Sequence, residues 1–287
     1  MFKVRMETHY QIRQPASRRL FVKAAKTWSA LILSLLTLTA CTVSPTGRQQ
    51  ALLFDDRQLA AMGQQAMVQY LAEKPTVASG RINRYVECVA QAITATVPTG
   101  TSDWRVVVFK DSTPNAFALP GGLIGVHTGL LDVTDNQDQL AAVIGHEVGH
   151  VLARHANERL SQQMLASTGL QLLGSAVGSQ YGASAAADLQ RFGPLLTHTA
   201  ILLPYSRSHE TEADQIGLEL MARAGFDPRE APRLWQNMNR AGSAQTVTFL
   251  STHPSNTARQ SALSAQLPQV LPVYQQALAR GVRPRCG

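Results

Sequence analysis

The sequence lacks the features of several protein classes. Only 3 cysteines occur in 287 residues, which excludes a small disulfide-stabilised scaffold. No apolar stretch reaches the roughly 20 residues that a transmembrane helix needs, and no unit repeats in tandem. With 45% hydrophobic residues, the chain is typical of a globular protein with one large domain or two smaller ones.

Beyond residue 40 the chain also lacks an excess of either charge. The formal net charge is +7, but residues 1–40 hold 7 basic side chains and a single acidic one, Glu7. The rest of the chain keeps 19 of the 26 basic and 18 of the 19 acidic side chains, so it is close to neutral. A nucleic-acid partner is therefore not expected, because it would require a basic surface on the folded part.

The N-terminus reads as an export signal. A basic region is followed by the apolar run WSALILSLLTLTA (residues 28–40) and by LTAC, which ends at Cys41. This pattern resembles the lipobox of bacterial lipoproteins. It predicts a signal peptide over 1–40, acylation of Cys41 and a lipidated tether over 41–50, with several acyl chains giving stable membrane anchoring. Thr42, where an Asp would signal retention, favours the periplasmic face of the outer membrane.

Two alternatives stay open for this segment. An uncleaved anchor helix is disfavoured because the apolar run is short. The pair Arg18-Arg19 is compatible with twin-arginine export as well as with the Sec route. Export would place Cys88 and Cys286 in an oxidising compartment, where a disulfide between them is as plausible as two free thiols.

Periodicity from residue 51 onward predicts a single α+β domain, 51–287, that is mainly helical with a small sheet of about three strands. The expected strands are 104–109, 116–119 and 123–127. The expected helices are 57–71, 81–97, one capped by Thr134 with Gln137, 208–224, 228–239, 256–267 and 270–279. Residues 166–200, rich in Ala, Gly and Ser, are either a packed helical insertion or a mobile lid.

The helix that follows Thr134 contains the chemistry. His146 and His150 lie one helical turn apart on one face, the spacing that two ligands of a tetrahedral zinc need. Glu147 lies about 100° around the helix, where it can reach a water molecule held by the metal. Gly145 and Gly149 cost about 1 kcal/mol each in a helix, which is explained if another backbone approaches closely there.

A catalytic zinc needs a third protein ligand, and the segment ETEAD at residues 210–214 offers one. Glu210 and Asp214 share a helix face, so one carboxylate could bind the metal while the other orients a ligating histidine. Glu212 should point elsewhere. The alternative is a solvated helix N-terminus, at which acidic residues are also favoured.

Four motifs in this order resemble those of the HtpX and CAAX-prenyl-protease type of zinc metallopeptidases: NAFALPGG (115–122), GHEVGH (145–150), ETEAD (210–214) and THPSNTAR (252–259). The likeness is greatest to the periplasmic lipoprotein branch of BepA-like and LoiP-like members, and it runs from Ser44 to about Gln266. The chain lacks a tetratricopeptide tail, so it is LoiP-like in size.

The resemblance implies a gluzincin fold with one zinc ion. It implies that His146, His150 and Glu210 are the ligands, that Glu147 is the general base and that Asp214 supports a ligand. It also implies that Asn115, Ala116, Phe117 and Ala118 lie on an edge strand that binds substrate by backbone pairing. His253 is either a regulatory fourth ligand, as in BepA-like members, or a simple capping or packing residue.

The function expected from these features is zinc-dependent hydrolysis of unfolded or misassembled envelope proteins by a lipid-anchored endopeptidase. Its partners would be such substrates, the membrane and the outer-membrane assembly machinery. The main alternative is a chaperone or assembly factor for outer-membrane proteins whose zinc is capped by His253. A weaker one is a zinc amidase or peptidase acting on cell-wall peptides.

Overall fold

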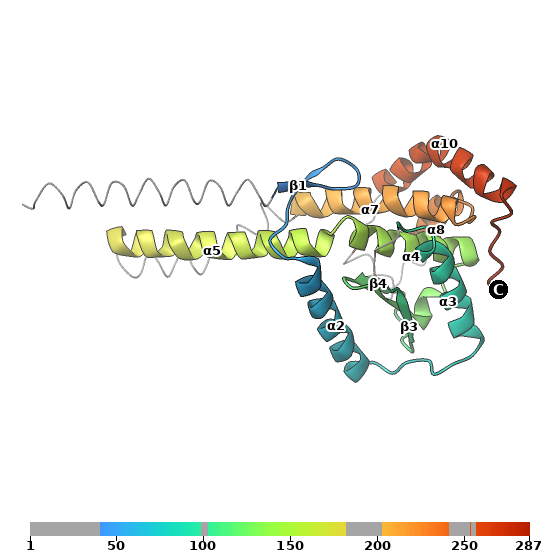
Figure 1. Cartoon of the computed structure of the whole chain (residues 1–287), viewed down its shortest axis with the longest axis horizontal. Helices are drawn as coiled ribbons and strands as arrows, with labels where there is room; N and C mark the ends of the chain where they lie inside the picture. Colours follow the sequence, from blue (N-terminus) through green and yellow to red (C-terminus); the bar gives the residue numbers. More distant parts are fainter. Residues whose placement is uncertain (1–40, 99–102, 182–202, 241–252, 254–256) are drawn as a thin grey trace, which may run out of the picture. The chain divides into compact units, whose positions relative to one another are not determined.

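The computed structural model describes residues 41–98, 103–181, 203–240, 253 and 257–287 (Figure 1). The expected signal peptide, the latter part of the 166–200 segment and most of the stretch before His253 lie outside these residues. Two short strands, β1 (Cys41–Val43) and β2 (Gln49–Ala51), begin the described chain. The fold is the expected one, mostly helical with a three-stranded sheet.

The sheet consists of β3 (Arg105–Phe109), β4 (Ala116–Leu119) and β5 (Leu123–His127), close to the predicted bounds. Its order is β3-β5-β4, with β3 parallel and β4 antiparallel to β5. Every residue of the central strand β5 is buried, as its apolar sequence LIGVH requires. Strand β4 therefore lies at an edge of this sheet, where the resemblance placed it.

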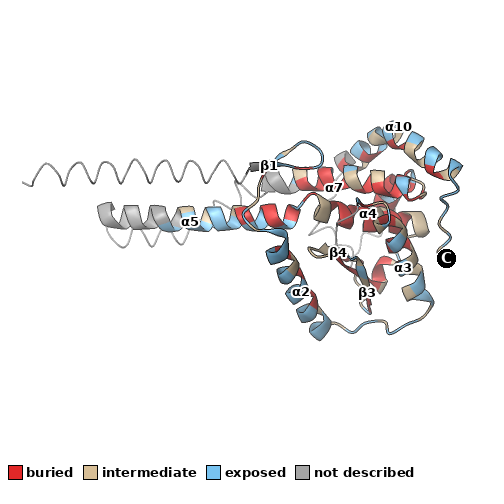
Figure 2. Ribbon diagram, viewed as in Figure 1, coloured by how far each residue is buried: buried red, intermediate tan, exposed pale blue. Residues whose placement is uncertain are grey.

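Helix α4 (Gln137–Leu152) is the centre of the fold and packs along α7 (Leu203–Arg223) (Figure 1). Figure 2 shows that α4 is buried over most of its length, and none of its residues is exposed. The two helices approach closely because glycines lie at their contact: a Cβ on Gly145 would come within 2.9 Å of the Gly217 carbonyl oxygen, and one on Gly149 within 2.8 Å of that of Ala213. The prediction from these helical glycines is confirmed.

The start of α4 differs from the prediction. Asn136 is the N-cap, and its side chain accepts a hydrogen bond from the Gln139 amide. Thr134 instead donates its hydroxyl hydrogen to the Leu130 carbonyl. The expected capping box at Thr134 was wrong because Asn136, a stronger N-cap residue than Thr, stands two positions later.

The other helices surround this centre: α2 (Asp56–Glu73), α3 (Arg81–Thr94), α8 (Glu230–Arg240) and α10 (Thr257–Ala279). The two helices predicted after residue 256 form a single one, α10, with Pro268 and Pro272 inside it. Each internal proline removes a helical hydrogen bond, yet Leu263 and Val270 pack into the core on either side of Pro268, and α10 bends in Figure 1.

A disulfide joins Cys88 of α3 to Cys286 near the C-terminus, with 5.5 Å between the Cα atoms. This settles the alternative that the sequence left open.

Helix α5 (His155–Tyr181) covers the first part of the 166–200 segment as helix. Met164 and Leu165, which lie on α5 just before this segment, are each 52% exposed, so the core does not bury these two side chains. None of the helices within the described ranges combines the length and apolar character needed to cross a bilayer.

Candidate metal centre

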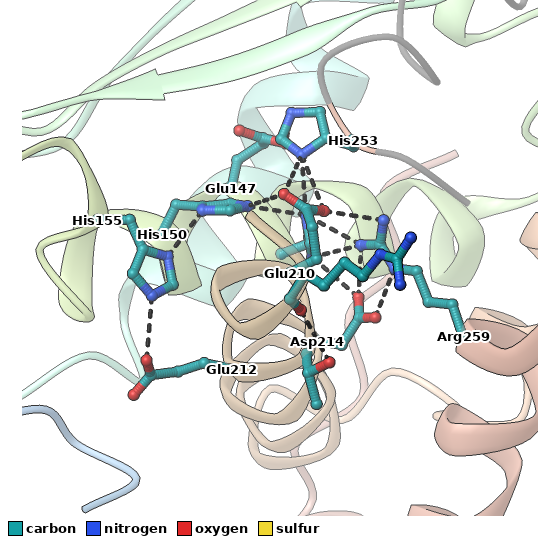
Figure 3. Close-up of polar contacts among 11 residues, drawn as sticks. Glu147, His150, His155, Glu210, Glu212, Asp214, His253 and Arg259 are labelled. Atoms are coloured by element: carbon teal, nitrogen blue, oxygen red, sulfur yellow. Dashed lines mark hydrogen bonds and ion pairs between the residues drawn. The ribbon is translucent and has the colours of Figure 1, made fainter. Parts of the chain in front are cut away.

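Four side chains from three parts of the chain converge on one point (Figure 3). His146 and His150 come from α4, Glu210 from α7, and His253 from the residues before α10. The Nε2 atom of His146 lies 3.0 Å from His150 Nε2, 3.2 Å from Glu210 Oε2 and 3.2 Å from His253 Nδ1. His150 Nε2 lies 3.3 Å from Glu210 Oε1, and His253 Nδ1 lies 3.2 Å from both Glu210 oxygens.

This donor set fits zinc. Ligands held about 2.0–2.1 Å from a tetrahedral zinc lie about 3.3–3.4 Å from one another, since the edge of a tetrahedron is about 1.63 times its radius. The distances given above, 3.0–3.3 Å, are close to these edges. Imidazole nitrogen and carboxylate oxygen are also the donors that zinc prefers outside thiolate sites.

The His146 ligand is oriented by a carboxylate in direct contact. His146 Nδ1 lies 2.9 Å from Asp214 Oδ1, so it donates its proton there and leaves Nε2 free for the metal. Asp214 in turn accepts hydrogen bonds from Arg259 Nε at 2.5 Å and Nη2 at 2.7 Å. Arg259 also reaches Glu210 Oε2 at 2.9 Å and stacks 4.0 Å over the ring of Trp235.

The His150 ligand is oriented through a second histidine (Figure 3). Arg154, whose φ is 55°, turns the chain sharply between α4 and α5. As a result, His155 Nδ1 lies 2.8 Å from His150 Nδ1. The other nitrogen of His155, Nε2, lies 3.1 Å from Glu212 Oε2. His150 therefore has a buried carboxylate in its support, but one imidazole further away than that of His146.

The Glu212 carboxylate, itself buried, belongs to a larger polar network. It accepts hydrogen bonds from Thr46 Oγ1 at 2.5 Å and from Arg48 Nε at 2.9 Å. Arg48 also donates through both terminal nitrogens to Glu158, at 2.7 and 2.6 Å. His209 Nε2 faces Glu158 at 3.1 Å. Thus the segment predicted as a tether contributes two side chains, Thr46 and Arg48, to a network that reaches His150 of the candidate metal centre.

Glu147 lies buried beside this group of side chains. Its side chain is 4% exposed, and its Oε1 accepts no hydrogen bond from any residue that the structure describes. Oε1 lies 3.4 Å from Nε2 of His253. A buried carboxylate oxygen without a donor is costly, and a water molecule or substrate amide beside the metal would satisfy it.

The protonation of this site follows from its neighbours. Burial and the Arg259 guanidinium each lower the pKa of His146, but its bonds to Asp214 and Glu210 outweigh them and raise it to about 9. Burial lowers the pKa of His150 well below its usual value, and burial with the nearby His209 lowers that of His155 to about 4. The pKa of Glu210 would rise on burial, yet hydrogen bonds to the ligand histidines hold it far below its usual range.

A cleft of about 440 Å³ opens beside Glu147 and His150. One wall is Ala118 of the edge strand with Pro120 and Gly121 of the turn that follows it. Ala116, Phe117 and Ala118 are paired with β5 on one side, which leaves the other edge of β4 outside the three-stranded ladder. Asn115 extends this ladder, because its carbonyl accepts the His127 amide.

The structure therefore brings together the predicted residues His146, Glu147, His150, Glu210, Asp214 and His253. The expectation that Glu212 points elsewhere missed its role, since its carboxylate supports His150 through His155. Arg259 was within a motif of the resemblance but had no role assigned, and nothing in its spacing indicated one. Arg48 and Thr46 could not be found from the sequence, because they lie more than 150 positions from Glu212.

Comparison with known proteins identifies the family of this chain. Residues 77–267 match the family model described as Peptidase family M48. The mitochondrial metalloendopeptidase OMA1 of Schizosaccharomyces pombe is 39% identical over 190 residues, covering 64% of this chain and 53% of that protein. The beta-barrel assembly-enhancing protease of Yersinia pestis is 30% identical over 208 residues, covering 70% of this chain and 42% of that protein. The matches thus span about half the length of these curated relatives.

Proposed function

This chain belongs to peptidase family M48, and we propose that it is a zinc metalloendopeptidase that cleaves unfolded or misassembled proteins of the bacterial envelope. The observation that carries the proposal is the convergence of His146, His150 and Glu210 at zinc-ligand spacing beside the buried carboxylate of Glu147. Relatives named as a metalloendopeptidase and a protease support the same reaction class.

Each residue has a distinct part in this reaction. The three ligands would hold a zinc ion, which when bound polarises a scissile carbonyl and acidifies water. Glu147 would take a proton from the attacking water on Oε1, which accepts no hydrogen bond from the described residues, and pass it to the leaving amine. Asp214 keeps the Nδ1 proton of His146 in place, so Nε2 faces the metal in the correct tautomer.

The substrate proposed is an extended polypeptide. The edge of β4 that pairs with no described strand borders the cleft, and an unfolded chain can pair with such an edge through its backbone whatever its side chains. A folded protein has few unpaired backbone groups and would bind poorly. The relative named for β-barrel assembly supports outer-membrane proteins, and their assembly machinery, as clients and partner.

The location proposed is the periplasmic face of the outer membrane. It rests on the lipobox-like LTAC and on Thr42 after Cys41, which together favour a lipid anchor of the LoiP-like kind.

The mechanism is tested by Glu147→Gln, which keeps the size of the side chain but cannot accept the proton. We expect the loss of casein cleavage by about 10²–10⁴-fold or more, with one zinc still bound per chain. Zinc content by mass spectrometry and cleavage by gel assay measure both. Cleavage by Glu147→Gln at the wild-type rate would contradict the proposed general base.

A second candidate function is supported by one observation. His253 Nδ1 lies 3.2 Å from His146 Nε2 and from Glu210 Oε1, the spacing expected between two ligands of one zinc ion. It would therefore fill the fourth coordination position, which a catalytic zinc keeps open for water or substrate. The protein would then hold unfolded outer-membrane proteins in its cleft as a chaperone, or be a protease that His253 regulates.

Comparing wild type with His253→Ala separates these functions. Faster, chelator-sensitive casein cleavage by His253→Ala would identify a regulated protease. The absence of cleavage by both proteins, with binding of outer-membrane protein precursors retained, would favour the chaperone.

A further inference from the structure

The segment that follows Cys41 is held by buried polar groups. Ser44 and Gln50 are 5% and 4% exposed, and Gln50 Nε2 donates to the Ala153 carbonyl at 2.6 Å and to Glu158 at 2.9 Å. Between them, Arg48 crosses from Glu212 to Glu158, both of which are almost fully buried. A flexible spacer needs no such contacts, so this segment has a more specific role.

The hydrogen bonds of this network run in one direction. If Nε2 of His150 faces the metal, then Nδ1 of His150 carries the proton and donates it to Nδ1 of His155. His155 consequently carries its proton on Nε2 and donates it to Glu212. The Glu212 carboxylate is acceptor only, and its remaining lone pairs take the hydrogen bonds of Thr46 and Arg48.

We propose that Arg48 is a positioning residue for the metal ligand His150, acting through Glu212 and His155. The inference rests on the proposed function in that His150 must bind the metal. Arg48 fixes Glu212 through Nε, and its terminal nitrogens are fixed by a two-pronged pair with Glu158. The segment 44–50 is thereby a working part of the metal site.

Removing Arg48 would leave two nearly buried carboxylates without their shared cation. Glu212 would then be held less firmly against His155, so His155 would fix the ring orientation and tautomer of His150 less well. Loss of such a supporting contact typically weakens metal binding by 10–100-fold. Because Arg48 lies two residues beyond His155, the direct partner of His150, we expect the lower end of this range.

The test is zinc binding by the full chain, measured by chelator competition for wild type, Arg48→Gln and Arg48→Lys. We expect Arg48→Gln to raise the Kd for zinc about tenfold. Arg48→Lys keeps the positive charge but not the planar guanidinium group that bonds Glu158 through two nitrogens. It should therefore recover part of the zinc affinity that Arg48→Gln loses. The matched control is Arg223→Gln, which removes an exposed ion pair with Glu219 on α7 and should leave the Kd unchanged.

A wild-type Kd in Arg48→Gln would overturn the inference, even if that variant melts at a lower temperature, because the role of Arg48 would then be only structural. If Arg48→Gln does not fold, Thr46→Val decides the matter. Thr46 is exposed and gives a single hydrogen bond to Glu212, so its loss should raise the Kd about threefold, and an unchanged Kd would contradict us.

The same experiment separates this inference from the proposed function. Wild-type protein that binds zinc but cleaves nothing would leave the positioning role of Arg48 intact and remove the protease. A wild-type chain that binds no zinc would overturn both.

Discussion

The two histidines of α4 in the candidate metal centre are supported in different ways. His146 contacts the Asp214 carboxylate directly, and Arg259 of α10 completes that support. His150 reaches its carboxylate, Glu212, only through His155, and the support ends at Arg48 near the start of the described chain. The support of His146 is therefore a direct contact, called the short support below, and that of His150 is a series of three side chains, called the long support.

This difference shows how one short segment of α7 serves both ligands. Glu210 and Asp214 lie on one face of the helix, and Glu212 lies on another, toward α5. Support that runs through three side chains depends on every one of them being held, whereas a direct contact depends on one. The His150 side should therefore respond gradually to substitution along its length, and the His146 side abruptly.

The largest expected effect comes from breaking the short support with Asp214→Asn. The neutral amide holds the His146 proton less well, and Arg259 loses the carboxylate that accepts hydrogen bonds from its Nε and Nη2 atoms, while its contact with Glu210 stays. We expect the Kd for zinc to rise by 10–100-fold and the protein to lose about 3 kcal/mol of stability, since a buried ion pair loses one partner.

Chelator competition and urea unfolding measure these two quantities. Glu212→Gln is the comparison, with an expected loss of zinc affinity at the low end of the same range. Glu219→Gln on the exposed side of α7 is the control and should change neither quantity. A greater loss in Glu212→Gln than in Asp214→Asn would reverse the comparison.

A moderate effect is expected from Gly149→Ala, which disturbs the close packing of α4 against α7 on which the support of both histidines depends. The new methyl group would lie 2.8 Å from the Ala213 carbonyl oxygen, so α4 and α7 must separate. We expect a loss of about 1–3 kcal/mol, measured by urea unfolding. Gly169→Ala is the matched control, because nothing lies within 4 Å of its added Cβ and alanine favours the helix.

The smallest expected effect is on the stability of the protein at low pH, to which Glu158 contributes. Burial raises the pKa of Glu158, but bonds to His209 and Arg48 outweigh this and hold it at about 2. Because its folded pKa lies below the unfolded one, Glu158 stabilises the protein above about pH 4.5, and this contribution is lost as the pH falls toward 2. Unfolding of metal-free protein should therefore depend less on pH in Glu158→Gln between pH 4.5 and 2. Parallel curves for the two proteins would contradict this.

The sequence predicted the parts of the site that depend on spacing within one helix. The spacing of four between His146 and His150, and between Glu210 and Asp214, follows from helix geometry alone. The strands 116–119 and 123–127 were also predicted with their observed bounds, because a Pro-Gly-Gly turn separates two short apolar runs.

What the sequence could not predict depends on contacts between distant elements. The support of His150 requires the turn at Arg154 and the docking of residues 44–50, and neither follows from local propensity. The prediction of two helices instead of α10 was wrong for a similar reason. Its two internal prolines favour a break in the helix locally, but the burial of Leu263 and Val270 in the core keeps the helix continuous.

The docking of Ser44 has a further consequence for where the protein can act. Ser44 is buried, and Cys41 is three residues earlier, so at most about 10 Å of chain separates them. With the proposed lipid on Cys41, this short connection would keep the folded domain close to the membrane surface. The cleft would then be accessible only to unfolded chains that are delivered to the membrane surface or that stall there.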